Sequence, residues 1–320
     1  MIERMYIGSY SDNIKVCEFC DGKIKVIDIV KGLVNPSYLH VNDNILYSVS
    51  ESMTGSITVF KIEKHTLKIV NTKQIGQKLP CYITTDRERK NLLIANYESG
   101  SILKYQLEEN GTIGKEKYKK TVNKSSHMHY VKFVENNIFA VDLGNDIIYI
   151  YNSEMELISS IKLDKGSGPR HFAMSKDNKK IYIITELSNE IHVYEKCNNK
   201  YKLIQKVSTL VNKNVQSFAG AIKISSNNKN IYVTNRGDNS ISVFEITKDN
   251  IELIQNISSY GDFPRDIVLN NSEEYAVVTN QKSNNVAIYI RDIENGLLKI
   301  EDANLKIEKP SCVVRSNYEI

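Results

Sequence analysis

Apolar residues recur along this chain in short alternating runs, and no stretch longer than ten residues repeats them with the 3.6-residue period of a helix. Six segments share one pattern, in which an apolar run, a polar turn and a second alternating run follow one another. A seventh copy of this pattern opens the chain. The pattern predicts β-hairpins. The seven segments are residues 5–19, 45–60, 92–105, 138–151, 181–194, 231–244 and 276–289.

Another short apolar strand, with its own lead-in residue, precedes every hairpin except the first. A period near 45 residues with several strands in each repeat is typical of a β-propeller. The sequence therefore predicts an all-β fold, a seven-bladed β-propeller. The lead-in residues, which recur every 43 to 50 positions, are Pro36, Pro80, Ser126, Pro169, Ala219, Pro264 and Pro310.

The two ends of the chain complement each other. The last lead-in is followed by a single strand around Lys309–Val314, and the hairpin that this repeat lacks is the one at residues 5–19. We therefore expect the N- and C-terminal strands to share one blade, which closes the ring and removes free strand edges. A propeller of this kind is one domain, so residues 1–320 are predicted to form a single seven-bladed propeller domain.

Composition and charge exclude several classes of protein. Hydrophobic residues make up 41% of the chain and charged residues 25%, as in ordinary globular proteins. The net charge of +4 is too small to indicate a nucleic-acid or membrane partner. No apolar run has the length of a membrane span or of a signal peptide. Five scattered cysteines fit reduced thiols, so we expect a cytoplasmic protein.

The hairpin geometry places a set of charged residues at one rim. Residues just before the first strand of a blade and just after its antiparallel second strand lie at the same end. Arginine suits carboxylate or phosphate groups, and histidine and glutamate are the usual general acids and bases. The pattern predicts a site for a small anionic ligand. The alternative is that these side chains are solvated charges in loops and bind no ligand. The rim residues are His127, His129, Arg170, His171 and Arg265 before first strands, and Asp142, Glu186, Arg236 and Gln281 after second strands.

A metal site is the rival interpretation of the same rim. His127 and His129 alternate, so on a regular strand they would point the same way, and with Glu186 or Asp142 they could hold a divalent ion. The three arginines nearby would repel such a cation. We therefore expect no metal at the rim.

Four motifs of this chain resemble those of the seven-bladed lactonase family, which includes propeller-type 6-phosphogluconolactonases and fungal carboxy-muconate cyclases. Two of them are Gly-Pro-Arg-His-Phe at residues 168–172, together with the strand and turn at residues 181–187, and Tyr-Val-Thr-Asn-Arg-Gly at residues 232–237. His-Met-His at residues 127–129 and Phe-Pro-Arg at residues 263–265 come in the family's order, each with its second-strand partner. Ser126 stands where the family usually has proline or a small residue, whereas residues 217–222 keep the expected small-residue pattern. The resemblance covers nearly the whole chain and implies a cleft lined by His129, Arg170, Glu186 and Arg236.

The resemblance implies hydrolysis of a small anionic sugar lactone, with 6-phosphogluconolactone as the favoured substrate. A cycloisomerase of an unsaturated diacid and a non-catalytic binding platform are the alternatives. No GxSxG motif is present, so a serine acyl-enzyme has no support. Glu186 or His129 is expected to activate water, Arg170 to stabilise the oxyanion, and Arg236 with Arg265 to hold the anion, without a cofactor. The residues expected to contact the substrate are His127, His171, Arg265, Asp142 and Gln281.

Overall fold

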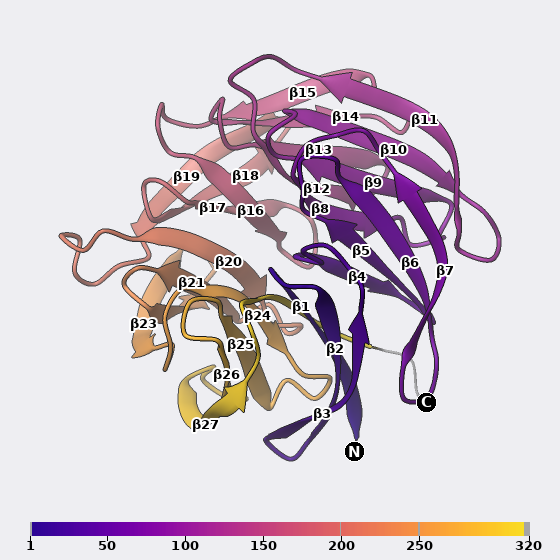
Figure 1. Ribbon diagram of the computed structural model, residues 1–320. Coiled ribbons are helices and arrows are strands. Elements are labelled where there is room, and N and C mark those ends of the chain that lie inside the picture. The colour runs from indigo at the N-terminus through magenta and orange to yellow at the C-terminus, as the bar shows by residue number, and fades with distance from the viewer. Residues whose placement is uncertain (1, 199, 249, 317–320) are drawn as a thin grey trace. The chain divides into compact units, whose positions relative to one another are not determined.

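The computed structural model describes residues 2–198, 200–248 and 250–316, and their strands form seven four-stranded sheets (Figure 1). Consecutive strands from β4 to β27 pair antiparallel within each sheet, which is the arrangement of strands in a propeller blade. The prediction of a seven-bladed β-propeller is confirmed.

The sheet that holds both chain ends has the order β28-β1-β2-β3, which confirms the predicted closure by N- and C-terminal strands in one blade. Strand β1 is buried along its whole length, and the N–H of Ser316 donates to the Arg4 carbonyl at 2.8 Å. The strands of this blade are β28 (Pro310–Arg315), β1 (Glu3–Ser9), β2 (Asn13–Cys20) and β3 (Lys23–Lys31).

The other six blades follow one another along the chain. The next three consist of β4 (Leu39–Asn42), β5 (Ile45–Ser50), β6 (Ser56–Ile62) and β7 (Leu67–Gln74); β8 (Pro80–Thr85), β9 (Asn91–Asn96), β10 (Ser101–Leu107) and β11 (Ile113–Thr121); and β12 (Met128–Val134), β13 (Asn137–Asp142), β14 (Ile147–Tyr151) and β15 (Leu157–Lys162). The last three consist of β16 (Pro169–Met174), β17 (Lys180–Thr185), β18 (Glu190–Cys197) and β19 (Lys200–Ser208); β20 (Phe218–Ile224), β21 (Asn230–Arg236), β22 (Ser240–Ile246) and β23 (Ile251–Ser258); and β24 (Pro264–Leu269), β25 (Tyr275–Asn280), β26 (Asn285–Arg291) and β27 (Leu298–Lys306).

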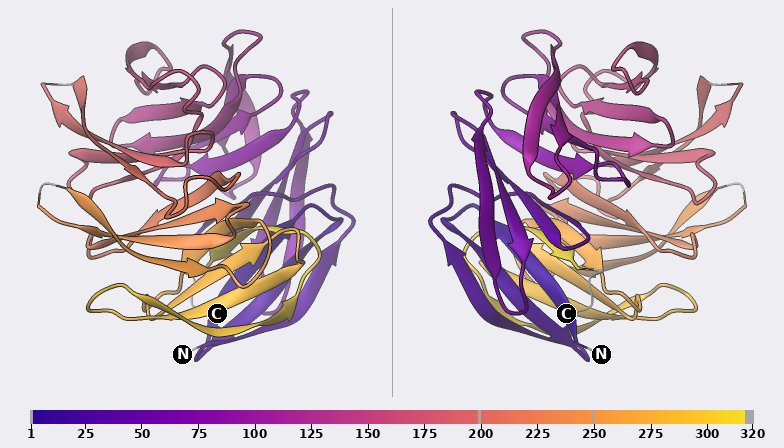
Figure 2. Two further views of the ribbon diagram at one scale, coloured as in Figure 1. Left: turned by 90° about the vertical axis from the view of Figure 1, so that its left-hand side faces the viewer. Right: turned by 90° about the vertical axis from the view of Figure 1, so that its right-hand side faces the viewer.

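Contacts between Cα atoms group the chain into two compact units. The first contains the residues up to Phe19, Lys25–Leu163 and the residues from Val314 onward, and the second contains Cys20–Ile24 and Asp164–Val313. Within the second unit, the three blades β16–β19, β20–β23 and β24–β27 lie in successive layers (Figure 2). That the whole chain behaves as one domain stays a prediction.

Neighbouring blades pack through apolar side chains, and tyrosines belong to the buried clusters between them. In the first unit Tyr47 and Tyr105 belong to one buried cluster, and in the second unit Tyr232 and Tyr289 belong to another. A buried tyrosine needs a partner for its hydroxyl. The hydroxyl of Tyr47 donates to the Gly111 carbonyl at 3.0 Å, and that of Tyr232 donates to the Gly296 carbonyl at 2.9 Å.

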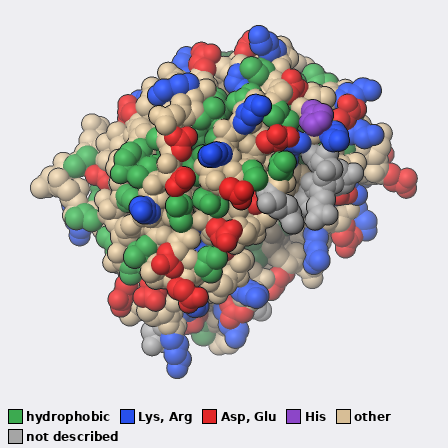
Figure 3. Space-filling model, turned by 90° about the horizontal axis from the view of Figure 1, so that it is seen from below, with side chains coloured by type: hydrophobic (Ala, Val, Ile, Leu, Met, Phe, Trp, Pro, Cys, Tyr) green, Lys and Arg blue, Asp and Glu red, His purple; other side chains and the backbone are tan. Residues whose placement is uncertain are grey.

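The surface carries both signs of charge. Basic and acidic side chains are interspersed with apolar ones over the face drawn in Figure 3. In the part of the chain that the structure describes, no helix is long and apolar enough to cross a membrane. The cytoplasmic location stays a prediction.

One irregularity recurs at the start of the first strand of several blades. In β16, Pro169 pairs with Thr185 and His171 pairs with Ile184, so Arg170 is an extra residue without a partner position on β17. Such a β-bulge turns a side chain away from the regular alternation of a strand. The bulges of β8, β12 and β24 contain Cys81, His129 and Arg265, and that of β20 contains Gly220 and Ala221.

Candidate active site

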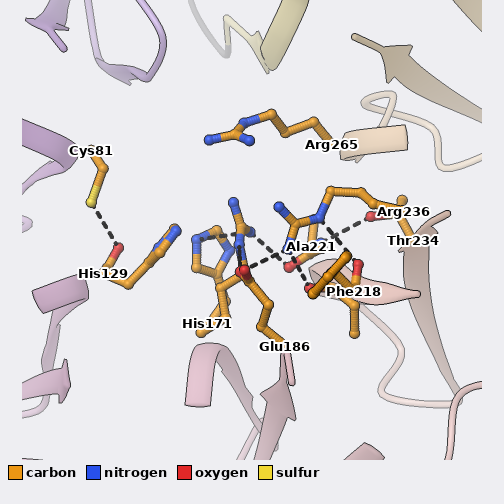
Figure 4. A network of polar contacts seen from close by, with 12 residues as sticks. Cys81, His129, His171, Glu186, Phe218, Ala221, Thr234, Arg236 and Arg265 are labelled. Atoms are coloured by element: carbon orange, nitrogen blue, oxygen red, sulfur yellow. Dashed lines mark hydrogen bonds and ion pairs between the residues drawn. The ribbon is translucent and has the colours of Figure 1, made fainter. Parts of the chain in front are cut away.

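The second unit places one carboxylate between two arginines (Figure 4). Glu186 follows β17, Arg170 lies in the bulge of β16, and Arg236 ends β21. The Oε2 atom of Glu186 lies 3.1 Å from Nε of Arg170 and 2.7 Å from Nη2 of Arg236. The antiparallel pairing of β16 with β17 thus brings Arg170 and Glu186 to the same end of the blade, as the sequence predicts.

The backbone around Glu186 is fixed by Gly168. The Glu186 N–H donates to the Gly168 carbonyl at 2.7 Å. Gly168 has a φ of +62°, a left-handed conformation that favours glycine, and a Cβ there would lie 2.5 Å from Cγ of Leu187. Glycine at this position therefore allows the lead-in loop of β16 to hold the residue that carries the carboxylate.

Backbone carbonyls of β20 orient both arginines. Nε of Arg236 donates to the Phe218 carbonyl at 3.1 Å, and its Nη2 donates to the Ala219 carbonyl at 2.9 Å. Nη1 of Arg170 donates to the Gly220 carbonyl at 2.7 Å. Three consecutive carbonyls thus accept from two guanidinium groups, so these side chains are positioned before any ligand binds.

The absence of a side chain at Gly220 is what allows this arrangement. A Cβ at Gly220 would lie 2.5 Å from Oγ1 of Thr234 and 3.1 Å from the Pro264 carbonyl oxygen. The Thr234 hydroxyl oxygen accepts a hydrogen bond from the Ala221 N–H at 2.9 Å, which holds the bulge in place. Glycine at position 220, within the small-residue pattern at residues 217–222, therefore has a direct steric cause.

The arginines of this cluster shift the pKa of the carboxylate, and burial and neighbouring charges shift the pKa of Arg236. Burial on its own would raise the pKa of Glu186, but the positive charges of Arg236 and Arg170 outweigh it, so the pKa lies below its ordinary value. Burial, followed by the nearby charge of Arg170, lowers the pKa of Arg236 to about 10, which keeps this guanidinium protonated at neutral pH. Arg265 also acts on both groups, so three arginines lie around this carboxylate.

Arg265 and its neighbours complete the part of the site in the second unit. Nη1 of Arg265 lies 3.4 Å from Oε1 of Gln281, and Figure 4 shows the Arg265 side chain extending past Arg236. The ring of Phe263 lies 5.3 Å from Cζ of Arg236. His171 is buried, and its Nε2 lies 3.3 Å from Nη1 of Arg170, so this imidazole contacts the arginine.

The two remaining histidines lie in the first unit, where they pack on one tyrosine. The ring of His127 stacks on Tyr97 with centroids 4.5 Å apart, and the ring of His129 meets Tyr97 edge-on at 5.8 Å. His127 precedes β12 and His129 is its bulge residue, so the regular strand that the argument from their alternation assumed is not present here. The thiol of Cys81, in the bulge of the preceding blade, donates to the His129 carbonyl at 3.6 Å (Figure 4).

Asp142 supports this histidine loop from inside the blade. Its carboxylate is fully buried and accepts from the Ser126 hydroxyl at 2.8 Å, the His127 N–H at 2.9 Å, and the side-chain amide of Asn145 at 2.7 Å. These bonds occupy both carboxylate oxygens. Direct contact between Asp142 and a substrate stays a prediction, and its observed contacts are with its own loop.

Sequence reasoning identified the charged side chains and missed the groups that orient them. Backbone acceptors such as the carbonyls of Phe218 and Ala219 have no residue-type signature, and Gly220, where a Cβ would clash, is the one signal in the sequence that could have indicated a close approach. Tyr97 directly follows β9, and its packing against two histidines depends on the bulge of β12. Among the described residues, no three histidine, cysteine or acidic side chains are grouped so as to hold a metal ion.

Comparison with known proteins places this geometry in a family. The family described as "Lactonase, 7-bladed beta-propeller" matches residues 4–315. The chain belongs to this family. A lactonase-family relative from Formosa agariphila, called 6-phosphogluconolactonase, is 32% identical over 98% of this chain and 99% of its own. A Bacillus subtilis protein of the same name is 31% identical over 96% of this chain and 97% of its own.

A solved structure has the same fold over its whole length. The crystal structure of a protein from Lactobacillus plantarum superimposes with a TM-score of 0.93 at 28% identity. The match covers 99% of this chain and 100% of that one.

Proposed function

We propose that this protein hydrolyses a small anionic sugar lactone, and that 6-phosphogluconolactone is its substrate. The observation that carries the proposal is the placement of Glu186 between Arg170 and Arg236, with Arg265 also acting on its carboxylate. Preorganised guanidinium groups stabilise an oxyanion and bind phosphate or carboxylate. The relatives called 6-phosphogluconolactonase support this choice of substrate.

Hydrolysis of a lactone requires an activated water, a stabilised oxyanion and a protonated leaving group. In the proposed reaction, a carboxylate oxygen of Glu186 accepts a proton from water as the water oxygen bonds to the lactone carbonyl carbon. Arg170 stabilises the negative oxygen that results. The ring C–O bond then breaks, and the proton on Glu186 passes to the leaving alkoxide, so that the product is the open hydroxy acid.

The two oxygens of Glu186 suit different tasks in this scheme. The ion pairs with Arg170 and Arg236 both fall on Oε2. Among the residues that the structure describes, Oε1 accepts no hydrogen bond, and the side chain is 18% exposed. We therefore assign the proton transfer to Oε1, and His129 remains the rival candidate for the base.

A pH-stat assay with freshly prepared 6-phosphogluconolactone tests the proposal. We expect acid release well above the spontaneous rate, and the same rate after treatment with EDTA, since the scheme uses no metal. Isomerisation of an unsaturated diacid without acid release would instead identify a cycloisomerase. Absence of turnover with either substrate would support the binding-platform interpretation.

A further inference from the structure

Lys282 is a cation that the proposed mechanism does not use, although it follows Gln281 directly. It lies in the turn between β25 and β26, and its N–H donates to the Asp262 carbonyl at 3.0 Å. The side chain extends over the ring of Phe263, with Nζ 4.2 Å from the ring centroid. This is a cation–π contact, which holds an exposed lysine in one place without neutralising its charge.

The same ring also contacts the arginine–glutamate cluster. Cζ of Arg236 lies 5.3 Å from the centroid of Phe263, and Arg236 forms the ion pair with Glu186. Phe263 therefore connects the loop lysine to the centre of the site. The lysine stands at the edge of the site, because it is exposed whereas Arg236 is buried.

The ring is held firmly enough to fix this relation. Phe263 has a φ of +66°, its N–H donates to Oδ1 of Asn239 at 2.8 Å, and its carbonyl accepts from the Gln281 N–H at 3.1 Å. A left-handed conformation at a bulky residue persists only where its surroundings impose it. The position of the aromatic ring is thus set by its own blade and the neighbouring one.

The charge of Lys282 is not neutralised by an acid of the described chain. Within the described ranges, no carboxylate oxygen lies within 4.0 Å of its ammonium group. Lys282 therefore adds a positive charge beside the cluster of Arg170, Arg236 and Glu186, which it reaches through the ring of Phe263. A phosphate monoester carries a charge of about −1.5 to −2 at neutral pH, whereas an unphosphorylated sugar lactone is neutral.

We propose that Lys282, held against Phe263, binds the phosphate group of the substrate and selects phosphorylated lactones over neutral ones. This inference rests on the proposed function. In this proposal the reaction takes place at Glu186, and Lys282 contacts the phosphate group at the other end of the substrate. A cation at the edge of the site also attracts the dianion before it enters, so ionic strength should raise KM for the phosphorylated lactone.

The test compares two substrates, 6-phosphogluconolactone and gluconolactone, in the parent protein and in Lys282→Met. We expect the parent to prefer the phosphorylated lactone in kcat/KM. The substitution should lower this preference roughly three- to tenfold, mainly through KM, the size expected for a part-exposed charge-assisted contact. Lys282→Arg keeps the charge and the cation–π contact, and it should retain the preference.

Lys299→Met is the matched control, because Lys299 is an exposed lysine on β27 of the same blade and its loss changes the net charge equally. Inorganic phosphate provides a second readout, since it should inhibit the parent competitively and Lys282→Met less strongly. An unchanged preference in Lys282→Met, or an equal loss in Lys299→Met, overturns the role of Lys282. Absence of lactone hydrolysis in the parent overturns the proposed function instead.

Discussion

At the scale of single residues, Glu186 combines two properties that oppose each other. Its ion pairs with Arg170 and Arg236 keep it ionised, which a general base requires, and the same ion pairs weaken it as a base. A lactone is reactive enough to need only modest activation of water. A weak base on a preorganised arginine pair therefore fits this reaction better than it would fit amide hydrolysis.

Replacing Glu186 by Gln removes the charge and keeps the shape. We expect kcat for lactone hydrolysis to fall by about two to four powers of ten, the usual cost of losing a general base. Glu195→Gln is the control, since Glu195 is exposed on β18 of the same blade. Steady-state kinetics, with circular dichroism to check folding, measure the effect. A full loss in His129→Asn together with a normal rate in Glu186→Gln would transfer the role to His129.

The pH profile separates the same two candidates. Because the pKa of Glu186 lies below its ordinary value of 4.5, kcat/KM should stay constant on the acid side until the pH drops below that value. The ionised carboxylate likewise stabilises the fold above pH 4.5, and this contribution is lost as the pH falls through the lowered pKa. An acid limb near pH ~6.5, the ordinary range of imidazole, would contradict the assignment to Glu186.

At the scale of single elements, the β-bulges decide which side chains reach the site. The first strands β12, β16 and β24 each insert one residue near their start, and those residues are His129, Arg170 and Arg265. Without the extra residue, each side chain would follow the alternation of its strand. In β20 the bulge carries Gly220 and contributes backbone carbonyls in place of a charged side chain.

Gly220→Ala tests the bulge of β20. The added Cβ has to displace Thr234 or the bulge itself, which moves the carbonyl that orients Arg170. We expect kcat to fall at least about tenfold and the free energy of unfolding to fall by roughly 1–3 kcal/mol, as in overpacked cores. Kinetics and urea unfolding measure the two effects.

A second substitution distinguishes a local clash from a general loss of stability. Thr234→Ala removes the hydroxyl that a Cβ at position 220 would meet at 2.5 Å. The double variant should therefore regain part of the activity lost in Gly220→Ala. Normal kcat in the single variant would show that the position of the Gly220 carbonyl does not matter for catalysis.

At the scale of the whole molecule, closure of the first blade depends on residues from opposite ends of the chain. Strand β28 pairs with β1 and buries Cys312 and Val313. β1 is buried throughout, so loss of β28 would expose buried side chains of β1 and a row of its unpaired backbone groups. The last strand thus contributes to stability far more than its length suggests.

Ending the chain at Lys309 tests this closure. We expect the melting temperature to fall by roughly 10 °C, since several kcal/mol of burial and pairing are lost. The exposed edge should also promote aggregation, which light scattering detects beside the full-length protein. Unchanged stability and solubility would mean that β28 does not close the blade in solution.

The architecture of this protein follows from its sequence alone. Residues that alternate with a period of two, in repeats near 45 residues, leave few ways to bury their apolar faces, so the blades and the shared first blade could be predicted. The same pairing rule placed Arg170 and Glu186 at one end of one blade, because antiparallel neighbours in a hairpin are set by local register.

How the site is held could be learned only from the folded chain. A bulge shifts one residue relative to the partner strand, and the alternation of His127 and His129 in the sequence does not predict that shift. The Phe218, Ala219 and Gly220 carbonyls hold two arginines from neighbouring blades through backbone atoms, which every residue possesses. Residue type therefore predicts which charges gather, whereas their orientation depends on contacts between segments 17 to 50 positions apart in the chain.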